Sequence, residues 1–155
     1  MRKLLILLTF LVPSAAAFAQ ESMEKTMETR AREMHRVIGL NDPAVWKKFI
    51  KENYTQALID KPMRAKVQTS EEGNTSTKRE DVKAADNLEA KAGMFQRLHD
   101  DFGDSKIVSL KPNGEKLAMV VKNSEGMTGT FQLKFDKNKP YLIDGLGIEV
   151  NADMH

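Results

Sequence analysis

The sequence contains no cysteine among its 155 residues, and this absence excludes disulfide bonds, thiol chemistry and thiolate metal sites together. Small exported domains often depend on disulfides because their hydrophobic cores are thin. A chain of this length can bury one ordinary core without them, so we expect a single self-supporting domain over residues 20–155. The hydrolase motifs G-x-S-x-G and H-E-x-x-H are absent as well, so no motif points to hydrolysis.

Long apolar runs are scarce, and the clearest one stands at the N-terminus. Arg2 and Lys3 precede a nine-residue run from Leu4 to Val12 that only Thr9 interrupts. This run is too short for the roughly 20 residues that cross a bilayer as a helix. Ala17-Phe18-Ala19 satisfies the A-x-A rule for cleavage. We therefore expect a signal peptide over residues 1–19, a mature protein in the periplasm or outside the cell, and no stable membrane anchor after cleavage.

An excess of one charge is also missing once this segment is removed. The full chain has 24 basic and 22 acidic side chains, and the predicted signal peptide holds two of the basic ones and no acidic one. The mature chain would carry 22 of each. Because a neutral, mixed-sign surface lacks the electrostatic footprint of a nucleic-acid binder, we expect no binding to DNA or RNA.

Helical spacing of apolar residues predicts three helices in the first two thirds of the chain. Asn41-Asp42-Pro43 is a strong helix start, because a capping side chain precedes proline at the first helical position. Thr77-Lys78-Arg79-Glu80 matches a capping box, and the polar segment 69–76 before it predicts a loop. The expected helices cover residues 22–38, residues 43 to about 58, and residues 77–102, with glycines ending the first and the third.

After Gly103 the apolar residues alternate, which predicts strands over residues 107–110, 117–121, 127–135 and 141–150. The second of these is apolar throughout, so we expect it to be central and buried on both faces. Gly145 and Gly147 share one side of the last strand, where a missing side chain permits a bulge. The predicted fold class is α+β, with three N-terminal helices packed on a curved four-stranded antiparallel sheet.

Several of these features together resemble a known family over roughly residues 30–150. They are the Asn-Asp-Pro helix start at 41–43, the aromatic helix ending near Tyr54, the helix end Leu-His-Asp-Asp-Phe-Gly at 98–103, and Leu-Ile-Asp-Gly-Leu-Gly-Ile at 142–148. The chain is similar in these features to the small NTF2-like (cystatin-like α+β) domains of bacterial envelope proteins. Such domains are found N-terminal to exported serine hydrolase or peptidase domains, and here we expect the module to stand alone. The resemblance implies a fold more than a function.

Asp144, Tyr54 and His99 are the candidates for catalysis. On strict alternation Asp144 faces the inside of the sheet, and the resemblance implies a conical pocket in which desolvation would raise the pKa of an acid and suit it to proton abstraction. Tyr54 or Tyr141 would offer a hydroxyl to a developing oxyanion. A bulge at Gly145 would instead turn Asp144 outward. His99 precedes two aspartates, but adjacent helical residues point in different directions, so we expect no metal site there.

Aromatic and methionine side chains would line any concavity that the sheet forms, since ligand pockets are mostly apolar with a few polar groups. The same side chains would otherwise fill the core. The candidates for ligand binding are Trp46, Phe49, Phe95, Met127, Phe131 and Phe135.

The first hypothesis for function is an exported, non-catalytic NTF2-like module without cofactor or metal. It would bind a protein partner or a small apolar ligand, with a homodimer through the sheet as a further expectation. The alternative is an enzyme of the isomerase or dehydratase type that uses Asp144 as general base. A third reading, a cystatin-like protease inhibitor, would need a protruding apolar wedge, and no loop of that kind is evident.

Overall fold

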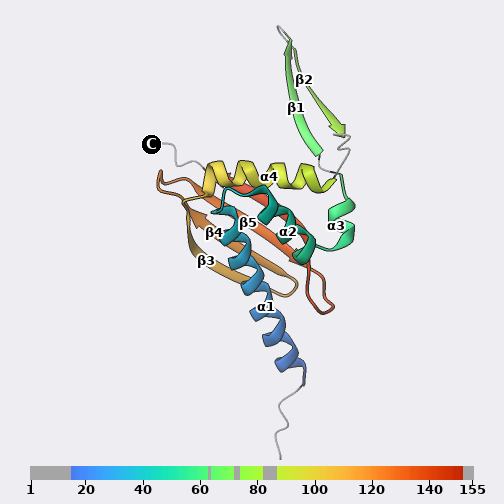
Figure 1. The fold of residues 1–155 in the computed structure, drawn as a ribbon, viewed down its shortest axis with the longest axis vertical. Helices are drawn as coiled ribbons and strands as arrows, with labels where there is room; N and C mark the ends of the chain where they lie inside the picture. The colour runs from blue at the N-terminus through green and yellow to red at the C-terminus, as the bar shows by residue number, and fades with distance from the viewer. Residues whose placement is uncertain (1–14, 63, 72–73, 82–86, 152–155) are drawn as a thin grey trace, which may run out of the picture.

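Helices precede a four-stranded antiparallel sheet, so the chain has the predicted α+β class (Figure 1). The computed structural model describes residues 15–62, 64–71, 74–81 and 87–151, and the side chains of 22–62 and 87–150. The helices lie over one face of the sheet (Figure 1). Within the described residues, none of the helices combines the length and the apolar character that a membrane span requires.

The first two helices begin and end largely as predicted. Helix α1 covers Ala15–Ile38 and α2 covers Pro43–Asn53. Asp42 caps α2, because its Oδ1 accepts hydrogen bonds from the backbone N–H groups of Ala44 (2.8 Å) and Val45 (3.3 Å). Helix α1 starts before the predicted residue 22 and contains the expected cleavage site, whereas most of the predicted signal peptide lies outside the described residues.

The prediction that the second helix continues to residue 58 is wrong. Tyr54 is extended (φ −98°, ψ 149°) and ends α2, and Thr55 caps a separate short helix, α3 (Gln56–Asp60). The cause lies far along the chain. Tyr54 forms a parallel bridge with Ile143, whose carbonyl accepts a hydrogen bond from the Thr55 N–H at 2.9 Å. Pairing with the sheet therefore overrides the local helical pattern.

The predicted loop at 69–76 and helix start at Thr77 are also wrong. Strands β1 (Arg64–Glu71) and β2 (Asn74–Asp81) form an antiparallel two-stranded sheet that projects from the rest of the chain (Figure 1). Helix α4 begins later and covers Asn87–Phe102. A capping box satisfies two backbone N–H groups, whereas the ladder between β1 and β2 satisfies groups along both strands, and the threonines of this segment favour strands.

The main sheet has the order β3-β4-β5-β6, formed by Lys106–Asn113, Lys116–Lys122, Thr128–Phe135 and Ile143–Asn151. Strand β4 is central, as predicted. Its burial on both faces is not borne out, because Leu117, Met119 and Val121 are buried while Ala118 and Val120 are only half-buried. No described helix covers the outer face, which explains the difference. The register shifts between β5 and β6 beside Asp144, where a bulge was a stated alternative.

The core lies between α1, α2, α4 and the inner face of the sheet. Phe102 of α4 packs on Phe131 of β5 with ring centroids 5.8 Å apart. The same Phe102 ring lies directly over Gly129, so close that a Cβ on this glycine would stand 2.6 Å from the ring. Gly129 is therefore required by helix–sheet packing.

We expect Gly129→Ala to lower the free energy of unfolding by about 1–3 kcal/mol, because the added methyl group overlaps a ring in a filled core. Gly147→Ala is the matched control in the neighbouring strand, where an added Cβ would meet only Gln132 at 3.7 Å, an ordinary contact. Urea unfolding of both variants measures the difference. Equal stability of the two variants would contradict the packing described here.

Candidate ligand site

The apolar residues predicted to line a ligand pocket are brought together in the core. Five of the six are buried, and Met127 is partly buried against them. Phe95 contacts Phe49 with ring centroids 5.8 Å apart, and the Trp46 indole N–H donates to the Val37 carbonyl at 2.8 Å. These side chains fill the space between the layers, and none of them lines the cavity described below. The buried five are Trp46, Phe49, Phe95, Phe131 and Phe135.

Asp144 lies at the edge of the sheet beside the β-bulge. Its side chain is 34% exposed and forms an ion pair with Lys134 at 3.2 Å. Thr55 Oγ1 donates a second hydrogen bond to the carboxylate at 3.1 Å. A general base of the kind proposed from the sequence needs burial in a cavity next to substrate. Asp144 has neither feature in this structure.

Tyr54 is the sequence candidate whose placement is chemically unusual. Its side chain is 3% exposed, and its hydroxyl has no hydrogen-bond partner among the described residues. Burial raises the pKa of Tyr54 above its usual value of 10, so the phenol stays neutral and able to donate. Leaving a buried hydroxyl unpaired costs about 1–3 kcal/mol. Such groups are rare in native proteins and call for an explanation.

A cavity of about 220 Å³ adjoins Tyr54 between α3, α4 and β6. Leu58, Met94, Leu146 and Pro62 give it a largely apolar lining, and Lys61 and Lys91 complete it.

Lys91 forms a fixed polar group in the wall of this cavity. It is only 4% exposed, and its Nζ donates to the carbonyls of Ile59 (2.8 Å) and Lys61 (2.7 Å) at the end of α3. Desolvation lowers the pKa of Lys91, opposed in part by the nearby Asp60 carboxylate. An ammonium group has three N–H donors and these carbonyls use two, so one donor remains for a ligand.

The sequence reasoning missed Lys91, although a signal was present. Lys91, Phe95, Leu98 and Phe102 stand at i, i+4, i+7 and i+11, which places the lysine on the apolar stripe of α4. A lysine on such a stripe is either exposed at its tip or engaged with a buried acceptor, and here it is engaged.

His99 and His35 join the C-terminal ends of α1 and α4. His99 Nδ1 lies 2.8 Å from the Ile38 carbonyl, so this nitrogen must carry the proton. His35 Nε2 lies 3.1 Å from the Ser105 carbonyl just beyond α4. Both contacts satisfy backbone carbonyls in the segments that end helices. His99 is therefore placed as a structural residue in this part of the fold.

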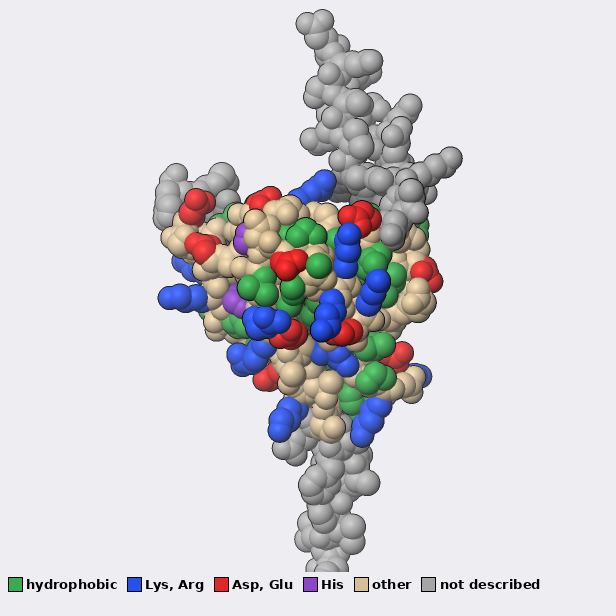
Figure 2. Space-filling model, viewed as in Figure 1, with side chains coloured by type: hydrophobic (Ala, Val, Ile, Leu, Met, Phe, Trp, Pro, Cys, Tyr) green, Lys and Arg blue, Asp and Glu red, His purple; other side chains and the backbone are tan. Residues whose placement is uncertain are grey.

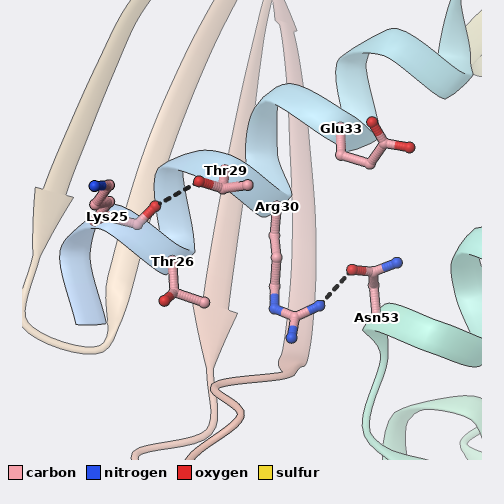
Figure 3. A pocket seen from close by; sticks show the side chains of 6 residues that line it. All are labelled: Lys25, Thr26, Thr29, Arg30, Glu33 and Asn53. Carbon is pink, nitrogen blue, oxygen red and sulfur yellow. Dashed lines mark hydrogen bonds between the residues drawn. The ribbon is translucent and has the colours of Figure 1, made fainter. Parts of the chain in front are cut away.

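A polar groove of about 430 Å³ runs along α1 and is the largest of the described hollows. Figure 3 shows Arg30 reaching from α1 to Asn53 at the end of α2. The guanidinium also donates to the Pro140 carbonyl at 3.0 Å, although its Nε has no partner among the described residues. Two of the three guanidinium nitrogens thus tie α1 to α2 and to the β5–β6 turn, so Arg30 acts here as a structural clamp.

Acidic residues near the end of α4 line a smaller hollow of about 190 Å³, formed in part by Asp100, Asp101, Asp104 and Glu125. Asp104 accepts hydrogen bonds from the backbone and the hydroxyl of Ser124. Among the described residues no group of three or more histidine or acidic side chains is arranged to hold a metal ion.

Comparison with protein-family models, with curated proteins and with solved structures gives no match for this chain. The function must therefore be argued from the Tyr54 cavity and its surroundings.

We expect the stability of the protein to fall on acidification from about pH 7.5 to about pH 5. Burial lowers the pKa of His35 below its usual 6.5, so in this window the unfolded chain binds more protons than the folded chain. Stability is then present above pH 6.5 and lost as the pH falls toward the folded pKa.

His35→Gln should lose less stability over the same interval, as measured by thermal unfolding at each pH. His155→Gln, which removes an imidazole from the last position of the chain, is the control and should behave as the parent does. An unchanged pH dependence in His35→Gln would contradict this account.

Proposed function

We propose that this chain is a non-catalytic NTF2-like module that binds a small, mainly apolar ligand in the Tyr54 cavity. The observation that carries the proposal is the buried Tyr54 hydroxyl, which lines the cavity and has no partner among the described residues. A ligand that accepts a hydrogen bond there would remove the cost of the unpaired group.

The cavity limits the ligand in size and in polarity. Its volume of about 220 Å³ lies below the range of about 300–1,000 Å³ that is usual for drug-sized ligands. Leu58, Met94 and Leu146 favour an apolar body, and the remaining donors of Tyr54 and Lys91 favour a carbonyl or carboxylate at one end. A monocyclic ketone or a short-chain acid has these properties.

The same groups favour binding over catalysis. A general base near neutral pH needs a pKa close to the working pH. Tyr54 has its pKa raised away from that range, and two backbone carbonyls engage the Lys91 ammonium. Asp144, the proposed base of the alternative enzyme, is ion-paired and does not line the cavity.

Export belongs to this proposal. The arguments for it are the basic start, the short apolar run and the A-x-A site in residues 1–19. The buried core residues of α1 begin at Met27, so cleavage after Ala19 would remove none of them. An NTF2-like assignment is supported by the order of helices before an antiparallel sheet and by the residues that carry the resemblance.

We expect Tyr54→Phe to shift stability and ligand binding in opposite directions. Removing the unpaired hydroxyl should raise the free energy of unfolding by about 1 kcal/mol. Affinity for acetophenone should fall about three- to tenfold through the lost hydrogen bond. Affinity for α-methylstyrene, a hydrocarbon of the same shape, should not fall. Titration followed by NMR and urea unfolding measure the two effects.

Tyr141→Phe is the matched control, because it removes the hydroxyl of the second tyrosine, which does not line the cavity. Met94→Trp, which fills the cavity, should abolish binding of both compounds while preserving the circular dichroism spectrum. Unchanged acetophenone affinity in Tyr54→Phe, or binding that survives Met94→Trp, would overturn the proposal.

For export, we expect the intact mass of the protein recovered from bacteria expressing the full chain to correspond to an N-terminus at Gln20. Replacing Ala19 by Arg should abolish processing, because the enzyme accepts only small residues at this position. An unprocessed parent protein that remains in the cytoplasm would contradict export.

A further inference from the structure

The outer face of the sheet carries five lysines. Cross-strand partners share a face, and the register pairs Lys106 with Lys122, Lys111 with the half-buried Ala118, and Lys116 with Lys134. All five lysines are exposed, and the buried residues of the same strands lie on the other face. Among the outward strand positions that the structure describes, the only acidic residue within the regular register is Glu149.

Two of these pairs place like charges directly opposite each other. Such pairs destabilise a sheet, and Lys106/Lys122 and Lys116/Lys134 stand near opposite ends of the face. Along β4, Lys116 and Lys122 are six residues apart, roughly 20 Å at the rise of a strand. Lysines on edge strands commonly prevent aggregation, but Lys116, Lys122 and Lys134 lie on the central strands β4 and β5. Protection of an edge therefore does not explain them.

The helical side of the molecule has a different charge pattern. Figure 2 shows basic and acidic side chains interspersed there. Lys47 pairs with Glu89 and Arg36 with Glu33 on this side. On the outer face only Lys134 has an ion-pair partner among the described residues, which is Asp144. The charges of the chain are thus segregated between its two sides.

We propose that the outer face of the sheet binds the surface of a bilayer that contains anionic phospholipids. The face offers charge complementarity, and none of the hollows described above is lined by its outward residues. Small or uncharged side chains occupy its middle, among them Ser109, Ala118 and Thr130. Lysines on flexible stems can follow lipid phosphates that move laterally, and each contributes to binding near an anionic surface.

Other occupants suit this face less well. Single-stranded nucleic acid is held by aromatic stacking, and phosphate recognition favours the arginine fork. The outward strand positions in the described residues hold no aromatic side chain and no arginine. A second copy stacked on this face would bring lysines against lysines. A fluid anionic surface has neither problem.

The test is co-sedimentation of the protein, as recovered from cells expressing the full chain, with phosphatidylcholine vesicles containing about a third phosphatidylglycerol. We expect binding to these vesicles, little binding to pure phosphatidylcholine, and release as the salt concentration rises from about 0.05 M to 0.5 M. The double variant Lys116→Gln/Lys122→Gln should bind about thirtyfold more weakly, which is about fivefold per lysine. Its thermal stability should not fall, because each substitution removes one member of a like-charge pair.

Lys48→Gln/Lys51→Gln is the matched control, since it removes the same charge from exposed positions on α2. It should bind the vesicles as the parent protein does. Equal weakening in both double variants would show a general charge effect and overturn the proposal. Equal binding to both kinds of vesicle would also overturn it. So would binding to a DNA duplex or to polyglutamate that depends on Lys116 and Lys122 in the absence of vesicle binding.

Discussion

The pairing of residues 54 and 55 with the edge of β6 is the constraint on which the candidate site depends. The Thr55 N–H donates to the Ile143 carbonyl, and this contact ends α2 and starts α3. Thr55 Oγ1 also accepts from the Leu58 N–H and donates to Asp144, so one side chain caps a helix and holds the bulge. Because Tyr54 is extended at this junction, its ring is turned into the core. A continuous helix would place it differently.

This constraint separates Tyr54 from the other polar groups buried nearby. The Trp46 indole, the His99 imidazole and the Lys91 ammonium all donate to backbone carbonyls near helix ends. Each of these contacts removes an unpaired donor and an unpaired acceptor together. Tyr54 is held by its backbone, so its hydroxyl cannot move to a similar partner without breaking the bridge to Ile143. An external acceptor is the remaining way to satisfy it.

The sequence predicts this fold well where local periodicity and tertiary packing agree, and poorly where distant pairing decides. Helix α1 ends where Gly39 indicated, and β5 buries Phe131, Leu133 and Phe135 as its alternation indicated. The break at Tyr54 and the strands β1 and β2 depend on partners that no local pattern reveals. Alternation also shows that a side chain points inward, but not whether the interior is filled. The predicted pocket residues therefore lie in the core, and the described cavity lies beside them.

Net charge is a further quantity that composition describes incompletely. The predicted mature chain is neutral, but the register of the sheet places five lysines on the face that no described helix covers. The alternation that buries Leu117, Met119 and Val121 also directs Lys116 and Lys122 to the opposite side, so segregation of charge follows from the strand period itself. The Tyr54 cavity lies among α3, α4 and β6, and none of its lining residues belongs to the outward set. A ligand in the cavity and an anionic surface against the sheet would therefore contact different residues, and the chain can bind both at once.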